Sequence, residues 1–326
     1  MDDNSDTCDF SVHPNDAFFK SIFSEPEHAT TFFKSHLAGE ISDHVDWASL
    51  KVMPTSFVKN SLSQIHSDLL FSVKISGREA LLYLLFEHQT TVDPAMPLRL
   101  FGYMGEILSQ HYKVHGLPLP PVVPYVLHQG PDRWTVSTHF EDLFDLPPET
   151  SAALLPFLPK FQHALLDLSC YNPSSQEADV QMRIVLHLMK LARDRQLVEF
   201  FEWLAQSIAV QLPDNLLKRL LLYALHADSN LDAEEIYHIL SANTELEEQA
   251  MSVAQKLKAE GRVEGRSEGR VEGRSEGLWI GKIQLMEEFL GKPLSSHELL
   301  EGNTLEALEA IYQALYLEYE LRFKQR

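Results

Sequence analysis

Two apolar segments separated by a tight turn constrain this chain more than any other feature. The first is SDLLFSVKI (67–75) and the second is EALLYLLFEHQ (79–89). Both are rich in the aliphatic and aromatic residues that favour strands, and Ser-Gly-Arg-Glu (76–79) is typical of the turn between them. The pattern predicts a β-hairpin with one face in the core of the protein.

Helical periodicity precedes and follows this hairpin. Residues 13–37 place apolar side chains at helical spacing, with a break at Pro26. Residues 98–114 repeat the pattern and end before Gly116. We expect a pair of helices before the hairpin and one helix after it.

Two further strands are expected, and strand signals then nearly vanish after residue 140. The segment VMPTSFV (52–58) is predicted to be an edge strand because it contains Pro54, and PVVPYVLHQG (121–130) is predicted to be a short apolar strand. The order is therefore helix, three strands, helix, strand. The second half of the chain is predicted to be helical, with helical patterns at 178–210, 213–227, 231–240 and 243–259.

The composition is that of a folded protein of about two domains. The chain has 326 residues, 44% of them hydrophobic, and domains average roughly 150 residues. It contains no run of about 18 apolar residues, and its acidic N-terminus lacks the features of a signal peptide. Cys8 and Cys170 are too few for a disulfide framework or a four-cysteine zinc site. We expect a cytoplasmic protein without a membrane segment.

The net charge of −20 argues against a protein that coats nucleic acid. Binding to phosphates depends mainly on Lys and Arg, which are outnumbered here. The charge does not exclude an enzyme that contacts nucleic acid through metal ions and one local basic face.

Residues 260–275 are four copies of the sequence Glu-Gly-Arg-X. A period of four would place every Gly on one stripe of a helix, where two helices can approach closely. Each interior Gly costs about 1 kcal/mol relative to Ala, however, and like charges recur at a spacing of four. A flexible or marginally helical linker and a self-associating helix both remain open. The expected domains are a disordered tail at 1–11, an α/β domain at 12–140, a helical domain at 141–259, the repeat linker at 260–277 and a helical segment at 278–326.

The hairpin brings two acidic residues together. If its turn is centred between Gly77 and Arg78, Asp68 lies directly opposite Glu87, and Gln89 shares the face of Glu87. Opposed residues have Cβ atoms about 4.5–5.5 Å apart, where two carboxylates repel each other. A Mg²⁺ ion would relieve this repulsion, polarise a phosphodiester and lower the pKa of a bound water, which Gln89 would orient. The alternative is a pair of solvated acids at the edge of the sheet.

Several segments of the first half together resemble one known family, the Rpn recombination-promoting nucleases, also described as YhgA-like transposases. The resemblance covers roughly residues 12–260. It implies membership of the PD-(D/E)xK nuclease superfamily, with an α/β fold whose mixed-sheet core has the order α-β-β-β-α-β, followed here by an all-α C-terminal region. The segments that carry it are HPNDAFFKSIFSEPEHATTFFKSHL, SDLLFSVKI, LLYLLFEHQT and MPLRLFGYMGEI.

The resemblance also assigns roles to the residues of the hairpin. Asp68 matches the metal-binding Asp of the family, and Glu87 matches the Glu of its Glu-x-Lys position. Gln89 stands where the superfamily usually has Lys. This departure leaves open which group stabilises the negative charge that develops during hydrolysis.

Two residue pairs on the predicted helices match further family positions. Asp16 and Lys20 resemble an Asp…Phe-Lys pattern, for which the alternative is a helix N-cap followed by a solvated Lys. Arg99 and Tyr103 resemble an Arg-Leu…Tyr motif. These two residues would bind phosphate near the metal or brace their helix against the sheet.

The predicted function is Mg²⁺-dependent hydrolysis of DNA, and the resemblance implies a role in recombination or transposase-like biology. A homodimer or higher oligomer is expected, since two nuclease domains would suit the cutting of both strands. One alternative is a catalytically weak protein-interaction module that keeps the nuclease fold, which the acidic charge and Gln89 favour. The other is a nuclease that acts on RNA.

Overall fold

The computed structural model describes residues 13–53, 67–87, 92–172, 179–207 and 212–323. The chain forms two compact units, residues 1–250 and 251–326. The expected tail at 1–11, most of the strand expected at 52–58, and Gln89 lie outside the described residues. Among the helices that are described, none is long and apolar enough to cross a membrane.

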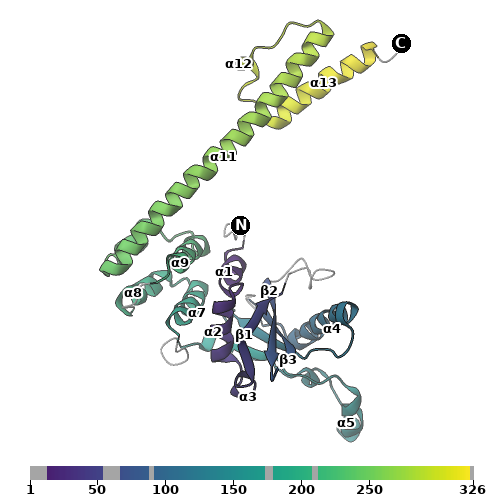
Figure 1. The fold of residues 1–326 in the computed structure, drawn as a ribbon, viewed down its shortest axis with the longest axis vertical. Helices are drawn as coiled ribbons and strands as arrows, with labels where there is room; N and C mark the ends of the chain where they lie inside the picture. Colours follow the sequence, from purple (N-terminus) through teal and green to yellow (C-terminus); the bar gives the residue numbers. More distant parts are fainter. Residues whose placement is uncertain (1–12, 54–66, 88–91, 173–178, 208–211, 324–326) are drawn as a thin grey trace. The chain divides into compact units, whose positions relative to one another are not determined.

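The first unit contains a five-stranded mixed sheet (Figure 1). The strands lie side by side in chain order, with β1, β2 and β3 antiparallel and β3, β4 and β5 parallel to one another. The elements up to the last strand are α1 (Pro14–Phe23), α2 (Pro26–His36), α3 (Gly39–Ser42), β1 (Val45–Val52), β2 (Ser67–Ile75), β3 (Arg78–Glu87), α4 (Met96–His115), β4 (Val122–His128), the 3₁₀ turn η2 (Phe140–Leu143), α5 (Pro148–Leu154), η3 (Leu155–Phe157) and β5 (Ala164–Asp167).

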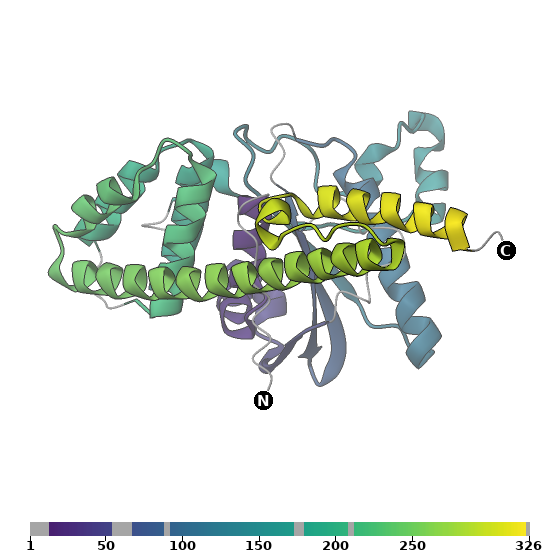
Figure 2. The same cartoon turned by 90° about the horizontal axis from the view of Figure 1, so that it is seen from above.

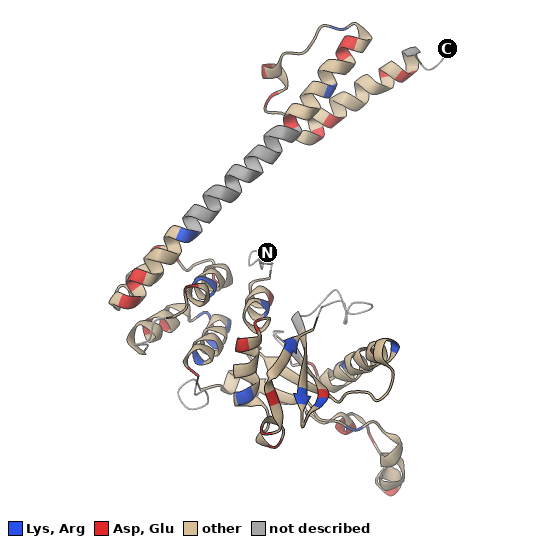
Figure 3. Ribbon diagram, viewed as in Figure 1, with Lys and Arg blue, Asp and Glu red and all other residues tan. Residues whose placement is uncertain are grey.

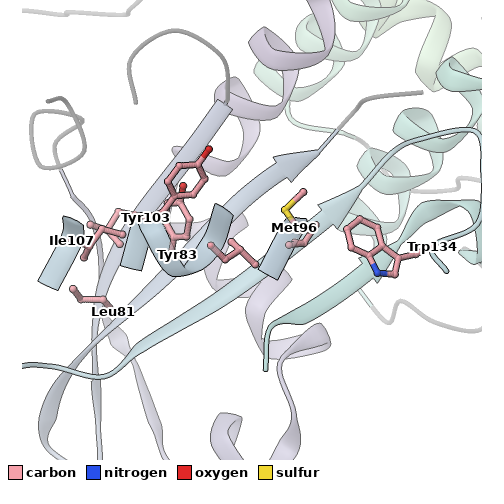
Figure 4. Packing of buried hydrophobic residues seen from close by; sticks show 9 residues of the cluster. Leu81, Tyr83, Met96, Tyr103, Ile107 and Trp134 are labelled. Atoms are coloured by element: carbon pink, nitrogen blue, oxygen red, sulfur yellow. The ribbon is translucent and has the colours of Figure 1, made fainter. Parts of the chain in front are cut away.

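Helices cover both faces of this sheet (Figure 2). On one face, Phe33 of α2 packs edge-on against Phe71 of β2 and Tyr125 of β4. On the other face, Leu100 and Ile107 of α4 pack against strand residues of a second core cluster, of which Figure 4 labels six members. The α/β fold with a mixed sheet is therefore confirmed.

The helices after β5 are η4 (Leu168–Cys170), α7 (Val180–Arg193), α8 (Leu197–Ser207), α9 (Asp214–Ala227), α10 (Ala233–Leu240), α11 (Thr244–Leu290), α12 (His297–Leu300) and α13 (Leu305–Phe323). Within the first unit, α9 packs on α1, and the rings of Phe18 and Tyr223 stack with centroids 4.3 Å apart. The helices up to α10 thus belong to the same compact unit as the sheet.

Two details differ from expectation. The region after residue 140 is not all-α, because Ala164–Asp167 forms β5 beside β4. The first strand covers Val45–Val52 and not VMPTSFV, so it begins seven residues earlier. The backbone of the Glu-Gly-Arg-X repeat is helical and lies within α11, as in two of the expected alternatives, a marginally helical linker and a self-associating helix.

Candidate functional site

The end of the sheet away from the Ser76–Gly77 turn collects the polar residues of four strands. The strand β2 begins at this end, whereas β3, β4 and β5 finish there. The backbone ladder pairs Glu87 with His128, and His128 with Asp167. We call this region, defined by Asp68, Glu87, His128 and Asp167, the polar end of the sheet.

The register of the hairpin differs by two residues from the prediction. Asp68 pairs with Leu85 and not with Glu87, because the turn is centred between Ser76 and Gly77. Both turn residues have positive φ angles, of 48° and 77°, as the tight two-residue hairpin turn requires. Asp68 is therefore diagonal to Glu87. Such positions are about 7–8 Å apart, farther than the predicted direct opposition.

Alternation along the strands places these positions on the face that α4 covers. Asp68 is two residues before Leu70, and His128 is two residues after Val126, and both of these apolar residues belong to the core cluster beneath α4. Glu87 is four residues after Tyr83 of the same cluster. The backbone thus brings the two predicted metal-binding positions to one end and one face of the sheet. Of Asp68 and Glu87, only the backbone is part of the described structure.

His128 is a polar residue that the sequence analysis did not identify. Its side chain is fully buried, and its Nε2 lies 3.0 Å from the carbonyl oxygen of Asp132. Its Nδ1 has no hydrogen-bond partner among the described residues. A pattern in the sequence could have identified His128, because the apolar run of β4 ends in Leu-His-Gln much as β3 ends in Phe-Glu-His-Gln.

Trp134 packs beside His128 and connects it to the end of β5. The two rings are 5.2 Å apart and nearly perpendicular. The backbone N–H of Trp134 donates a hydrogen bond of 2.8 Å to Oδ2 of Asp167. The centroid of the His163 ring lies 5.9 Å from that of the indole, and burial together with the neighbouring His139 lowers the pKa of His163 to about 4. His163 is consequently neutral at physiological pH.

Arg99 and Tyr103 of α4 are brought to the same face of the sheet. Arg99 Nη1 lies 3.0 Å from Asp93 Oδ2, and the two side chains are only 20% and 24% exposed. Tyr103 is buried, with its ring edge-on to Tyr83 at 5.9 Å (Figure 4). Tyr103 thus braces α4 against the sheet, which was one of its two expected roles. Its binding to phosphate stays a prediction.

Asp16 and Lys20 come from the opposite face, on α1. The helix begins at Pro14, so Asp16 lies in its first turn and is not the N-cap, a position that His13 occupies. Asp16 is half-buried, and Lys20 is exposed. The structure therefore does not place these two side chains with Arg99 and Tyr103, which project from α4.

A hydrogen-bonded chain nevertheless joins the first turn of α1 to the end of β4. The side-chain amide of Gln129, the residue after β4, donates to the Tyr223 hydroxyl at 3.1 Å, and this hydroxyl donates to Asn15 Oδ1 at 2.6 Å. Burial raises the pKa of Tyr223, so the hydroxyl keeps the proton that it donates. The start of α1 is thereby fixed near the polar end.

A cavity of about 230 Å³ lies beside Asn15 and Gln129 and is also lined by Arg193 and Arg195. Arg193 is already paired, because its Nε and Nη2 each donate a hydrogen bond of 2.6 Å to the carboxylate of Asp194. Arg195 is exposed. The helices α7 and α9 carry five Lys and Arg residues and one Asp (Figure 3), but Arg193 is paired with Asp194 and Arg219 with Glu25. The sequence analysis named none of these residues.

Among the side chains that the structure describes, no three His, Cys, Asp or Glu residues are grouped closely enough to hold a metal ion. A metal site at the polar end would therefore include a side chain outside this set, such as that of Asp68 or Glu87. The donor types at this end fit a divalent cation, because two carboxylate positions lie on adjacent strands and a buried imidazole nitrogen has no partner.

Comparison with known proteins identifies a family and several relatives. A model of the family described as "Putative transposase, YhgA-like" matches residues 13–229. The chain is 27% identical over 257 residues to the inactive recombination-promoting nuclease-like protein RpnE of Escherichia coli strain K12, a match that covers 77% of this chain and 84% of RpnE. It is 26% identical over 254 residues to the recombination-promoting nuclease RpnA of the same strain, covering 77% of this chain and 85% of RpnA.

A shorter match has higher identity. The recombination-promoting nuclease RpnD of Escherichia coli O157:H7 is 35% identical over 127 residues, which are 38% of this chain and 49% of RpnD. No solved structure gives a significant match. The family match covers 217 of 326 residues and includes the whole sheet and the helices on both of its faces. The chain therefore belongs to the family of YhgA-like transposases, which confirms the resemblance found in its sequence.

Proposed function

We propose that this protein is a nuclease that hydrolyses DNA phosphodiester bonds with the help of a divalent cation bound at the polar end of the sheet. The observation that carries the proposal is the backbone register, which puts Asp68 and Glu87 diagonally adjacent on the α4 face. Two relatives, RpnA and RpnD, are named recombination-promoting nucleases. A role in recombination or in the movement of mobile elements is part of the same proposal.

Asp68 and Glu87 would hold the cation, for which Mg²⁺ is the first candidate because it prefers oxygen ligands. The bound cation would polarise the scissile phosphodiester and supply a more acidic water. Gln89, two residues after Glu87, would orient the attacking water by accepting its hydrogen bond. The order α1, β1–β3, α4 and β4 supports the PD-(D/E)xK arrangement that we propose for this core.

The remaining candidates would bind and position the substrate. Arg99 would contact phosphate, and its ion pair with Asp93 fixes the direction of the guanidinium. The exposed Lys20 and Arg195 would neutralise phosphates farther along the strand. Asp16, in the first turn of α1, would help to order the site from the opposite face.

The test is cleavage of supercoiled plasmid by the purified full-length protein. We expect the wild type to cleave with Mg²⁺ or Mn²⁺ and to be inactive with EDTA, and Asp68→Ala and Glu87→Ala to lose at least about 100-fold in rate, since each removes a metal ligand. Asp46→Ala is a matched control, because Asp46 is an exposed strand residue beside Lys74, near the turn at the other end of the sheet. It should retain wild-type activity.

Two alternatives predict different outcomes of this experiment. A catalytically inactive interaction protein is favoured by the replacement of Lys by Gln89 and by the name of RpnE, which is described as inactive. In that case the folded wild type cleaves neither DNA nor RNA with any divalent metal. A ribonuclease would cleave RNA with the same dependence on Asp68 and leave the plasmid intact.

Self-association is a separate part of the proposal. We propose that the full-length protein forms a dimer or a higher oligomer, so that two sites act on the two DNA strands. Light scattering of the purified chain tests this point, and a monomer at all concentrations would contradict it without bearing on the chemistry of a single site.

A further inference from the structure

We infer that His128 is a third metal ligand at the polar end of the sheet, and that the site consequently binds Mn²⁺ more tightly than Mg²⁺. This inference rests on the proposed function, because it adds a nitrogen donor to the site formed by Asp68 and Glu87. No part of the sequence pattern assigned His128 a role.

The hydrogen bonding of His128 is that of a ligand histidine. Its Nε2 lies 3.0 Å from the carbonyl oxygen of Asp132, which can only accept, so this nitrogen carries the proton. The Nδ1 atom therefore has a lone pair, and it is buried without a hydrogen-bond partner among the described residues. Histidines that bind metals typically donate their other N–H group to a backbone carbonyl or a carboxylate, which fixes the tautomer.

An unsatisfied acceptor in this position is costly unless something binds it. A buried polar group that is left unpaired loses its hydration without gaining a hydrogen bond in return. His128 is fully buried between the sheet and Trp134, so bulk water does not solvate the ring. A metal ion that enters with the substrate would use the free lone pair and remove this penalty.

The register places His128 directly beside Glu87. These two residues are Cα partners in the parallel ladder of β3 and β4, and neighbouring strands are about 4.8 Å apart. His128 is two residues after Val126, on the face that also holds positions 68 and 87. Three adjacent strands therefore each contribute one donor residue at the same end and face of the sheet, with Glu87 in the middle.

The donor set determines which cation is preferred. Mg²⁺ prefers oxygen ligands almost exclusively. Imidazole nitrogen suits transition metals such as Fe²⁺, Ni²⁺ and Zn²⁺, and Mn²⁺ is the member of this series that also favours carboxylate ligands. Two carboxylates and one imidazole are thus a better site for Mn²⁺ than for Mg²⁺. If His128 is only a core residue, its replacement changes folding stability but not the relative affinity for the two ions.

His163 also packs against Trp134 and provides a matched control. Its ring is equally buried, at 1% exposure, and lies 5.9 Å from the indole, compared with 5.2 Å for His128. It precedes β5 and is not aligned with Glu87 in the ladder. His163→Gln therefore removes a buried imidazole from the same cluster without removing the proposed ligand.

The experiment measures metal binding directly, in the absence of DNA. Full-length wild type, His128→Gln, His163→Gln, Asp68→Ala and Glu87→Ala are titrated with Mn²⁺ and with Mg²⁺ by calorimetry. Electron spin-echo envelope modulation of the Mn²⁺ complexes detects directly bound nitrogen. We expect a ¹⁴N coupling in wild type and in His163→Gln that is lost in His128→Gln, together with a loss of Mn²⁺ affinity of about tenfold or more and a smaller loss for Mg²⁺.

Labelling wild-type histidines with ¹⁵N keeps the test independent of the folding of any variant. If the Mn²⁺ complex shows no histidine nitrogen, or if the coupling persists in folded His128→Gln, the inference is overturned, and in the second case His88 is the next residue to replace. Binding that depends on Asp68 and Glu87 but not on His128 refutes only the third ligand. A wild type that binds neither ion refutes both the inference and the proposed metal-dependent nuclease.

Discussion

The two faces of the sheet are built from different kinds of residue. The face under α1 and α2 is packed with Phe and Tyr rings that are almost completely buried, and several of these rings meet edge-on. Phe32 lies 5.2 Å from Tyr125, and Phe33 lies 5.5 Å from Phe71. Such packing contributes to stability and offers few polar atoms to a substrate.

The face under α4 combines apolar residues with buried polar ones. Its cluster includes Tyr83, Tyr103 and Trp134, and His128 is packed against the indole. The positions of Asp68 and Glu87 lie at the end of this same face. The difference indicates that the face under α1 and α2 mainly stabilises the fold. The face under α4 has polar residues in place of some apolar ones, and these belong to the candidate site.

The largest expected effect is on the aromatic face. Phe33→Ala should lower the free energy of unfolding by about 3–5 kcal/mol, because it leaves a cavity between Phe71 and Tyr125. Urea denaturation followed by circular dichroism measures the change, and Phe33→Leu, which fills much of the space, should cost less. A loss below about 1 kcal/mol for Phe33→Ala would show that this face does not dominate stability.

An intermediate effect is expected from acid on the face under α4. The pKa of His163 is lowered to about 4, so below the ordinary value of 6.5 the unfolded chain binds a proton that the native protein does not. The corresponding stability is complete above pH 6.5 and is lost as the pH falls towards 4, by up to about 3 kcal/mol. Chemical denaturation between pH 7.5 and 4.5 measures this slope.

His163→Gln should flatten this dependence on pH but not abolish it. Burial also lowers the pKa of His187, a half-buried residue of α7, to about 4, so a second histidine contributes to the slope. An unchanged slope in His163→Gln would mean that the acid sensitivity does not arise beside Trp134, and that the two faces of the sheet do not differ in this respect.

The smallest effect is expected at the start of α4. Asp93 accepts a hydrogen bond of 2.8 Å from the backbone N–H of Ala95 and pairs with Arg99. Asp93→Ala should therefore lower the free energy of unfolding by about 1 kcal/mol. Asp93→Asn, which keeps an acceptor for Ala95 but loses the charge, should recover most of this stability. If the two variants are equally unstable, the ion pair and not the hydrogen bond stabilises this turn.

Most elements could be predicted from the sequence because their signals are local. The span of β2 agrees with the predicted 67–75, and α4 ends before Gly116, whose φ of 75° few residues other than Gly adopt readily. The break at Pro26 separates α1 from α2 as expected, since Pro occupies the first turn of the second helix. In each case a few consecutive residues determine where the element begins or ends.

The register of the hairpin could not be obtained in the same way. Side chains alternate with a period of two, so moving the pairing from Glu87 to Leu85 opposite Asp68 leaves every apolar residue on the same face. The hydrophobic pattern is thus identical for both registers. Only the backbone of Ser76 and Gly77, with positive φ at both residues, selects the observed one.

The sequence by itself determined the family, the helices and strands of the core, and the acidic positions that we propose as metal ligands. Tertiary structure alone decided that Ala164–Asp167 is a strand, because these four half-buried residues form a strand only by pairing in parallel with β4. It also brought His128 beside Glu87, two residues that are 41 positions apart in the chain and adjacent in the ladder. Contacts between distant segments depend on how the elements pack, which a local pattern of residues does not encode.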